Sequence, residues 1–351
     1  MTSRTTTAVL IERHGLPKVL VEREVPLRDP GPGEVHLEVH TAGVNFADLF
    51  MRAGLYDTVP PRPYSPGFEV AGQIARVGPD VEGWQEGDRA VALIRYGGYA
   101  HDIIVSKRNL FHYPDSLTPV EAAATPVVFL TAWVALFGAA NARAGETALV
   151  LTAGGGVGSA AVQLAVHKGL RVVGTAGTEH KRSFVVNELG AEACFDSRSN
   201  WEPDVLELVG DRGIDVALDA VGGSATPACR RLLAPMGRLV FYGLSDAMPK
   251  RKRNWPRVAL AWLRTRPLHP LSLIQQNIGV FGIHLLHLQS REDLLIPALA
   301  EIYRGIEAGD WRPIVDRTFD LNRDGAVEAH RYIHARKNLG KVVLVNPEAG
   351  P

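Results

Sequence analysis

The stretch that most constrains the fold is an apolar run that ends in a string of glycines and resumes as a second apolar run. Ala148-Leu149-Val150-Leu151 leads into Thr152-Ala153-Gly154-Gly155-Gly156-Val157-Gly158, and Ala160-Ala161-Val162-Gln163-Leu164-Ala165 follows. This order predicts a buried strand, a tight turn and a helix, the unit from which doubly wound parallel sheets are built. Part of the chain should therefore be an α/β domain.

The glycine turn also carries a chemical signal. At such a turn the backbone can approach a pyrophosphate, and the following helix presents N–H donors and the positive end of its dipole. We expect Gly155 to allow that approach and Gly158 to let the helix pack on the strand, with Ala153, Gly156 and Val157 completing the binding turn. A tight turn in an unrelated α/β protein is the alternative, but the strand and helix around it favour a dinucleotide site.

The end of the next strand predicts which dinucleotide binds. NAD enzymes usually place a carboxylate there, about 20 residues after the turn, to accept the ribose hydroxyls. Gly177 stands nineteen residues after Gly158, and Thr178-Glu179-His180-Lys181 follows. A glycine, hydroxyls and a cation suit a 2′-phosphate, so we expect NADPH, with Gly177 and Lys181 in its site. Lys181 as a solvated helix lysine is the alternative, and Glu179 is interpreted as a helix N-terminal acid.

The rest of the sequence predicts two domains, because 351 residues exceed what one core usually serves. Up to about Phe111, short alternating runs broken by Gly and Pro predict an antiparallel, barrel-like β domain, with strands at 35–39, 73–77 and 89–93. From about Leu117, starting with an alanine-rich helix from Pro119, helices alternate with buried strands, as in βαβ units. Further strands are expected at 171–173, 216–218, 238–241 and 279–281, and helices near 157–168, 179–189, 224–233 and 291–308.

The end of the chain returns to strand and turn patterns and closes with a strand at 341–345, which we expect to rejoin the first domain. The predicted division is therefore 1–125 with 310–351 for the substrate domain and 126–309 for the NADPH-binding domain.

Charge and cysteine content restrict partners and location. Lys plus Arg and Asp plus Glu number 38 each, so no net field favours nucleic acid. Two cysteines, Cys194 and Cys229, are too few for a disulfide framework. The N-terminus shows no secretory signal, and no apolar run is seen to approach the ~20 residues of a membrane span, so a cytoplasmic location is expected.

A basic cluster, Lys250-Arg251-Lys252-Arg253, opens a segment at 250–273 that also carries Trp255 and Trp262. A basic segment with an apolar face can lie on anionic lipid. A lid or dimer contact with a solvated basic edge is the more common use of such a segment, and it is preferred here.

Motifs along nearly the whole chain resemble the medium-chain dehydrogenase/reductase superfamily, in its zeta-crystallin and quinone oxidoreductase branch. They occur in the family's order: Ala42-Gly43-Val44-Asn45-Phe46-Ala47-Asp48, Arg52-Ala53-Gly54-Leu55-Tyr56, Pro66-Gly67-Phe68-Glu69-Val70-Ala71-Gly72, Gly87-Asp88-Arg89-Ala90, Leu130-Thr131-Ala132-Trp133, the glycine turn, Gly174-Thr175-Ala176-Gly177-Thr178, Asp219-Ala220-Val221-Gly222 and Gly340-Lys341-Val342-Val343-Leu344. The segments 267–277 and 280–285 also look like the vesicle amine transport protein 1 subgroup. The resemblance implies a GroES-like β domain, a Rossmann domain and a homodimer paired through the sheet edge.

Zinc-dependent members of this superfamily hold a catalytic ion with a Cys, a His and a second Cys, and this sequence departs from that set. Asn45 lies in the region of the first ligand, and Phe68 replaces the His of a Gly-His-Glu motif. Two cysteines cannot supply a four-cysteine structural zinc lobe. His36, His40, His101 and His112 have no convincing ligand spacing, so no metal site is expected.

Without a Lewis acid, alcohol oxidation is difficult, whereas hydride delivery to an electrophilic acceptor stays accessible. The resemblance therefore implies an NADPH-dependent reductase of quinones or α,β-unsaturated carbonyls. It makes Asn45 and Tyr56 candidates for the catalytic polar groups, and Phe50 stands where related enzymes often carry a tyrosine, so water could protonate the product. An ordinary loop aromatic and a structural turn residue are the alternatives for Tyr56 and Asn45.

The remaining cofactor contacts follow from the resemblance or from their place after a strand. Thr131 resembles a threonine at the nicotinamide ribose, or else caps a helix. Lys341 either reaches the adenosine end or faces solvent. Residues at the expected carboxyl edge of the sheet are Gly243, Leu244, Phe281 and Ile283.

Two other functions stay open. An enoyl or 2-alkenal reductase would share every motif above. A non-catalytic protein that binds NADPH and docks on a membrane or a partner would use the segment at 250–273.

Overall fold

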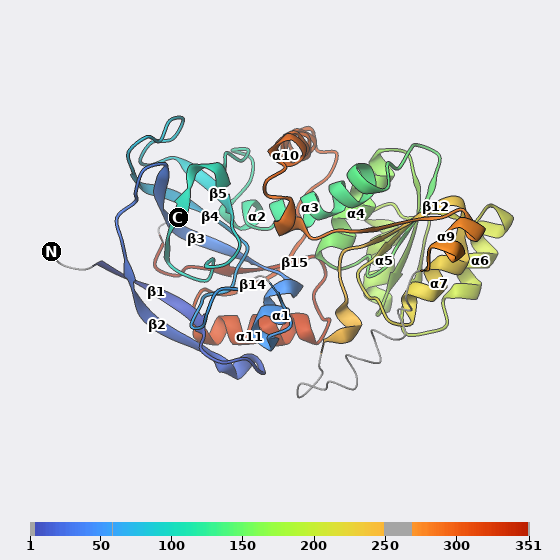
Figure 1. Cartoon of the computed structure of the whole chain (residues 1–351), viewed down its shortest axis with the longest axis horizontal. Coiled ribbons are helices and arrows are strands. Elements are labelled where there is room, and N and C mark those ends of the chain that lie inside the picture. The colour runs from blue at the N-terminus through green and yellow to red at the C-terminus, as the bar shows by residue number, and fades with distance from the viewer. Residues whose placement is uncertain (1–3, 58, 249–268, 350–351) are drawn as a thin grey trace. The chain divides into compact units, whose positions relative to one another are not determined.

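The computed structural model describes residues 4–57, 59–248 and 269–349. The chain forms two compact units (Figure 1). Unit 1 comprises the described residues of 1–127 and 313–351, and unit 2 comprises those of 128–312. The predicted segment at 250–273 lies mostly outside the described residues, so its basic cluster and tryptophans have no structural account here.

Unit 1 is built on a sheet whose pairing order is β14-β15-β3-β4-β5-β7, with β6 beside β3. Its pairs are antiparallel, as predicted, except for the parallel pair β14–β15. β1 and β2 form a separate antiparallel ribbon. The strands are β1 (Arg4–Ile11), β2 (Leu20–Leu27), β3 (Glu34–Val44), β4 (Glu69–Val77), β5 (Arg89–Leu93), β6 (Asp102–Ser106), β7 (Leu110–Phe111), β14 (Val315–Asp320) and β15 (Lys341–Val345).

The tail of the chain enters this sheet. β15 pairs with β3, which confirms the predicted return to the first domain. The tail is not only strand and turn, however, because α11 (Arg323–His334) is a helix. Asn322 caps it by accepting the N–H of Gly325 at 2.8 Å, and its buried side chains recur at helical spacing: Ala326, Val327, Ala329, His330 and Ile333.

Unit 2 contains the predicted doubly wound sheet. Its order is β10-β9-β8-β11-β12-β13, and every neighbouring pair is parallel. The order reverses beside β8, which makes the carboxyl end of β8 the topological switch point where ligands bind in such sheets. The strands are β8 (Thr147–Val150), β9 (Arg171–Ala176), β10 (Ala193–Asp196), β11 (Ile214–Asp219), β12 (Leu233–Phe241) and β13 (Gly279–Gly282).

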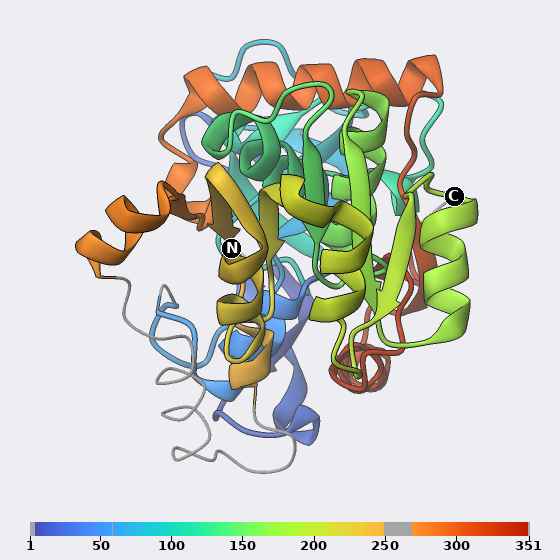
Figure 2. The same cartoon turned by 90° about the vertical axis from the view of Figure 1, so that its right-hand side faces the viewer.

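Helices cover both faces of this sheet (Figure 1). On one face α4 (Gly156–His167) and α5 (Glu179–Asn187) pack on β8, β9 and β10. On the other, α6 (Glu202–Val209) and α7 (Ala225–Leu232) share a buried core with residues that include Leu149, Ala217 and Leu239. α10 (Glu292–Ala308) is the long orange helix at the top of Figure 2.

The remaining helices are short. They are α1 (Phe46–Ala53), α2 (Pro119–Ala122), α3 (Pro126–Trp133), the π-helix Val134–Ala139, α9 (Pro270–Gln276) and the 3-10 turns Pro17–Val19, Lys107–Asn109, Gly210–Arg212, Ser245–Ala247 and Leu285–Leu288. The helix expected from Pro119 is interrupted before Pro126.

The expectation that no run approaches membrane-spanning length was wrong for one segment. The 21 residues Pro119–Ala139 are long and apolar enough to cross a membrane, because an 18-residue window within them has a mean hydropathy of 1.8. Of that window 72% is buried within the structure, and core helices of folded proteins share these properties.

Candidate functional site

The glycine turn of unit 2 joins β8 to α4 as predicted. A Cβ atom on Gly158 would lie 2.2 Å from the carbonyl oxygen of Thr152 and 2.8 Å from the Cα of Ala153. Both are backbone atoms, so any side chain at Gly158 would push the helix away from the strand. The helix packs closely because residue 158 is a glycine.

The start of α4 has the properties of a pyrophosphate cradle. Gly155 is its N-cap and brings no capping side chain, and a Cβ there would approach only the Thr152 oxygen, at 3.3 Å. The first N–H groups of the helix, from Gly156 and Val157 onward, are thus left to a ligand, which the positive end of the helix dipole attracts if it is anionic. Ala153 is different: it is fully buried, and its N–H donates to Thr175 at 2.9 Å.

The end of β9 lacks a carboxylate and brings a lysine to the turn. A Cβ on Gly177 would meet only the hydroxyl of Ser197, at 3.6 Å. The stem of Lys181 lies against Gly154, where a Cβ would be 3.3 Å from the lysine Cβ, so this side chain flanks the glycine turn. Glu179 is ion-paired with Arg182 on the first turn of α5, which fits a helix N-terminal acid.

The carboxyl edge of the sheet carries a buried phenol beside the other candidates. The Oη of Tyr242 meets no full hydrogen-bond geometry among the residues that the structure describes, and the side chain of Thr152 interacts with it. Burial holds the pKa of Tyr242 above its usual range, so the phenol keeps its proton. Such a buried donor, next to Gly243 at the switch-point edge, fits a site for a polar ligand.

The other predicted contacts of unit 2 differ in their exposure. Leu244 and Phe281 are exposed, whereas Thr131 is buried in α3. Gly243 leaves room for the carbonyl of Ala220, which a Cβ would approach to 2.9 Å, and Ile283 extends β13 by donating its N–H to Phe241 at 2.7 Å.

Asp219, quoted above only as part of a motif, shapes this edge. Its buried carboxylate accepts the N–H groups of Val221 and Gly222 at 2.7 and 2.8 Å. It also accepts the hydroxyl of Thr226 at 2.7 Å. The motif therefore builds the turn after β11. In Asp-Ala-Val-Gly a carboxylate stands two and three residues before the N–H groups that it accepts, and this spacing could have predicted the turn.

In unit 1, Asn45 stands at the N-cap of α1 and is bonded through both ends of its amide. Its Nδ2 donates to Glu69 at 2.9 Å, and its Oδ1 accepts from the Nζ of Lys341 at 2.6 Å. Lys341 also donates to Glu69. Lys341 is buried, so the alternative that it faces solvent is wrong. Its side chain contacts Asn45 and Glu69 within unit 1. Contact with an adenosine stays a prediction.

Asp48 stabilises the same N-terminus of α1 through its carboxylate. Its carboxylate accepts the N–H of Asn45 at 2.7 Å, the N–H of Gly67 at 2.9 Å and the hydroxyl of Tyr99 at 3.3 Å. Burial raises its pKa to about 7, although these bonds and the charge of Lys341 oppose the shift. Tyr99 continues the network to His330 at 3.2 Å.

Tyr56, the other candidate for a catalytic polar group, is partly buried. Burial raises its pKa, and the charges of Asp48 and Asp57 raise it further, so the phenol remains a hydrogen-bond donor at neutral pH. Its ring packs on Phe68, with centroids 5.6 Å apart.

The residue types around Asn45 do not form the zinc ligand set of the dehydrogenases. Phe68 is a buried aromatic, and Cys194 and Cys229 lie in β10 and α7 of unit 2. Among the histidines considered above as metal ligands, His36 pairs with Asp102 at 2.7 Å, His101 forms a hydrogen bond with Leu321, and His112 stacks on Trp84.

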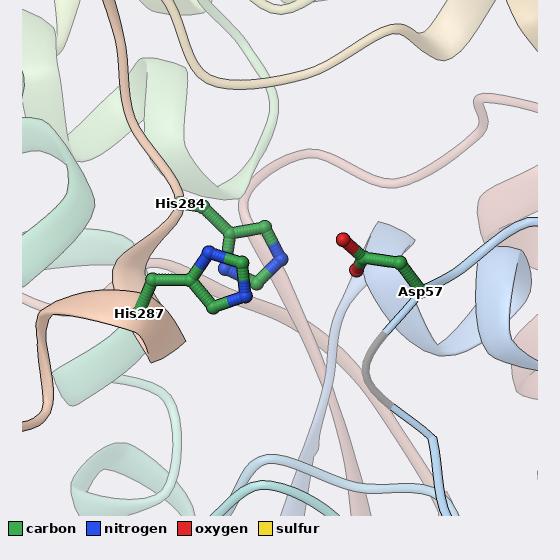
Figure 3. Close-up of side chains that lie close together, drawn as sticks. All are labelled: Asp57, His284 and His287. Atoms are coloured by element: carbon green, nitrogen blue, oxygen red, sulfur yellow. The ribbon is translucent and has the colours of Figure 1, made fainter.

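A pair of histidines in unit 2 was not singled out from the sequence. The rings of His284 and His287 are stacked, with centroids 4.0 Å apart, and both side chains are drawn in Figure 3. Two imidazoles by themselves are one ligand short of a catalytic zinc site. The spacing His-x-x-His is the signal that could have drawn attention to them.

Glu69 and Asp48 are two of the polar residues of unit 1 whose roles sequence reasoning missed. Asn45 and Asp48 have the spacing of a capping box, in which the third residue of the helix bonds back to the N-cap N–H. That spacing could have revealed Asp48. The role of Glu69 depends on Lys341, which is 272 residues away in the sequence, and no local pattern predicts it.

Comparison with known proteins agrees with both units. Residues 31–115 match the alcohol dehydrogenase GroES-like domain, and residues 156–301 match the zinc-binding dehydrogenase family. The chain is 36% identical to the synaptic vesicle membrane protein VAT-1 homolog of Rattus norvegicus, over 90% of this chain and 78% of that protein. It is 30% identical to the quinone oxidoreductase of Sus scrofa, over 97% of each.

Solved structures are similar over nearly the full length. A mycobacterial protein in complex with NADPH has a TM-score of 0.85 and 28% identity, covering 97% of this chain and 99% of that one. The CurK enoyl reductase has a TM-score of 0.83 and 26% identity, with the same coverage. The fold is thus a GroES-like β domain with a Rossmann domain, and the chain belongs to the medium-chain dehydrogenase/reductase superfamily, in the branch of the VAT-1 homologues and quinone oxidoreductases.

Proposed function

We propose that this oxidoreductase uses NADPH to reduce quinones or related conjugated carbonyl compounds without a metal. The observation that carries the proposal is the cluster at Asn45. In the region where zinc-dependent relatives place ligands, this chain has an amide bonded to a carboxylate and an ammonium, next to a buried phenylalanine at residue 68. These groups can donate hydrogen bonds and orient a substrate, but they do not form a zinc site.

The residues of unit 2 fit the dinucleotide. Gly155 leaves the backbone open, the N–H groups that begin α4 would meet the pyrophosphate, and Lys181 would pair with a 2′-phosphate. When bound, NADPH would supply a hydride. The absence of a carboxylate at Gly177 removes the usual partner of an NAD ribose, which supports the choice of NADPH.

The residues of unit 1 would act on the acceptor. When a quinone or an enal takes a hydride, negative charge develops on its oxygen, and N–H or O–H donors stabilise that charge. Tyr56 keeps its proton at neutral pH and Asn45 carries amide N–H groups, so both can serve as such donors. Water then supplies the proton that completes the product, since Phe50 replaces a possible phenol donor.

An enoyl or 2-alkenal reductase is the second candidate, favoured by the structural similarity to the CurK enoyl reductase. Both candidates need the same donors, and only the acceptor differs. The non-catalytic docking function depends on residues at 249–268, which lie outside the described residues.

Steady-state oxidation of NADPH against a panel of quinones and enals tests these functions, with NADH and chelator controls. Turnover that prefers NADPH and survives chelation supports the proposal, and the better acceptor class ranks the two candidates. Activity that a chelator abolishes and zinc alone restores would overturn the metal-free mechanism. Tight NADPH binding without turnover, together with flotation on anionic liposomes, would favour docking.

Assembly and location are part of the same proposal. We infer a homodimer through β13, because it is the last strand in the sheet order and apolar side chains near it are exposed: Met236, Leu271, Ile274 and Phe281. A cytoplasmic location is proposed from the sequence and is tested by cell fractionation.

A further inference from the structure

The amide of Asn45 is held by two charged side chains from distant strands of unit 1. Glu69 begins β4 and Lys341 begins β15, and the exposed fractions of Asn45, Glu69 and Lys341 are 8%, 0% and 3%. A buried carboxylate and a buried ammonium are costly to desolvate unless each is paired and hydrogen-bonded. Here they neutralise each other and both contact the same amide.

These contacts determine which way the amide points. An ammonium only donates hydrogen bonds, so the Asn45 atom 2.6 Å from Lys341 must be the oxygen. A carboxylate only accepts, so the atom 2.9 Å from Glu69 must be the nitrogen. The reversed rotamer would set N–H against ammonium and oxygen against carboxylate, and it is therefore excluded.

Glu69 and Lys341 are themselves fixed. The second oxygen of Glu69 accepts the N–H of Val127 at 2.8 Å. Gly43 leaves space for this carboxylate, because a Cβ there would lie 2.7 Å from the Oε1 of Glu69. The backbone of Lys341 is held in β15, where its N–H donates to Ile314 at 2.7 Å. Together these bonds hold the two charges in one geometry.

We propose that Glu69 and Lys341 are positioning residues that orient the Asn45 amide so that its second N–H is the donor to the acceptor oxygen. The amide has two N–H groups and two lone pairs, and the cluster uses one of each. The remaining N–H is pre-oriented without rotational freedom, which is the property required of a group that stabilises developing charge. This inference rests on the proposed reductase function.

The test compares the protein with a double variant that carries both Lys341→Met and Glu69→Gln. This variant removes both charges together and so avoids a lone buried ion. The single variant Lys341→Arg, which keeps the charge that pairs with Glu69 but changes the geometry of the donor to Asn45, is made as well. Asp102→Asn is the control, since it changes a different ion pair of unit 1, the partly buried pair with His36, which is not part of the cluster. The readouts are the side-chain amide resonances of Asn45, identified by their loss in Asn45→Ala, and the kinetics of NADPH oxidation.

In the parent protein we expect two well-separated Asn45 amide protons that exchange slowly with solvent. In the double variant they should approach the shifts of a free amide, and kcat should fall on the order of 10- to 100-fold while KM for the acceptor changes little, because misorientation acts on the transition state. Asp102→Asn should change neither readout. Thermal unfolding of each variant shows whether it is folded, and Lys341→Arg gives a test in the same direction if the double variant is not.

A folded double variant that keeps the parent's Asn45 resonances and kcat would overturn the inference. A parent protein with no reductase activity would instead overturn the proposed function, while the Asn45 resonances would still show whether Glu69 and Lys341 orient the amide. Loss of kcat with unchanged resonances would also refute the positioning role.

Discussion

The carbonyl oxygen of Thr152 occupies the place where a side chain on Gly158 would begin, since a Cβ there would lie only 2.2 Å from that oxygen. Thr152 adopts a positive φ of 55°, which is uncommon for a residue other than glycine. The strand end and the helix start are thus in direct backbone contact. The backbone conformation of residue 152 and the missing side chain of residue 158 together determine how closely α4 packs on β8.

Gly158→Ala should damage the fold of unit 2. The new methyl group meets backbone atoms that cannot rotate away, so we expect a loss of about 1–3 kcal/mol in the free energy of unfolding and weaker NADPH binding. Gly155→Ala is the matched variant, because its Cβ would meet the Thr152 oxygen only at 3.3 Å. It should keep the unfolding temperature but lose affinity for NADPH, measured by fluorescence titration. Equal stability of the two variants would contradict the packing argument.

Lys181→Ala should weaken NADPH binding more than NADH binding. Its stem lies on Gly154 of the turn, and only NADPH carries the 2′-phosphate that its ammonium would meet. A hydrogen bond to a charged group contributes about 1.5–3 kcal/mol, so the NADPH dissociation constant should rise on the order of 10- to 100-fold. Lys168→Ala removes another lysine of unit 2, one that pairs with Glu301, and should leave both cofactors unaffected. Equal losses for NADPH and NADH would refute the phosphate role.

Asp48 should make the protein less stable as the pH rises from about 4 to 7. Burial raises its pKa from 3.8 to about 7, so between these values the folded state holds a proton that the unfolded state has released. Stability from this group is therefore complete below pH 4 and is lost as the pH approaches 7. The difference in unfolding free energy between the protein and Asp48→Asn should shrink over this range, as denaturant titrations at each pH would show.

For Asp102→Asn we expect the opposite dependence of the unfolding free energy on pH. Burial opposes the shift, but hydrogen bonds from His36 and Thr6 lower the pKa of Asp102, so its contribution is present above its unfolded pKa near 3.8 and is lost in acid. If both variants showed the same pH trend, the shift assigned to Asp48 would be incorrect.

The exposed apolar side chains beside β13 should be buried in a dimer. Leu271 and Ile274 lie in α9 and are 61% and 69% exposed in the single chain. Leu271→Glu with Ile274→Glu would place charges in that interface and should shift the protein toward monomer in sedimentation velocity experiments. Leu206→Glu alters a similarly exposed residue of α6 and should not. A parent protein that sediments as a monomer would rule out this assembly.

The elements that could be predicted were those with a local signal. β8, the turn and α4 follow from one continuous stretch in which glycine and apolar residues leave few conformations, and the parallel sheet follows from repeating that unit. α11 was missed because its residues, 323–334, have few large apolar side chains, so its helical periodicity became evident only from which positions the sheet of unit 1 buries.

The candidate site divides in the same way. The sequence by itself determined the glycine turn between β8 and α4, the missing acid at Gly177, the departure from the zinc ligand set at Asn45 and Phe68, and the branch of the superfamily. Only the tertiary structure decided that Lys341 lies beside Asn45 and Glu69, and that Asp48 is buried with a raised pKa. The reason is physical: a glycine's freedom and an apolar period act between neighbours along the chain, whereas hydrogen bonds and desolvation depend on residues that folding brings together from 272 to 296 positions apart.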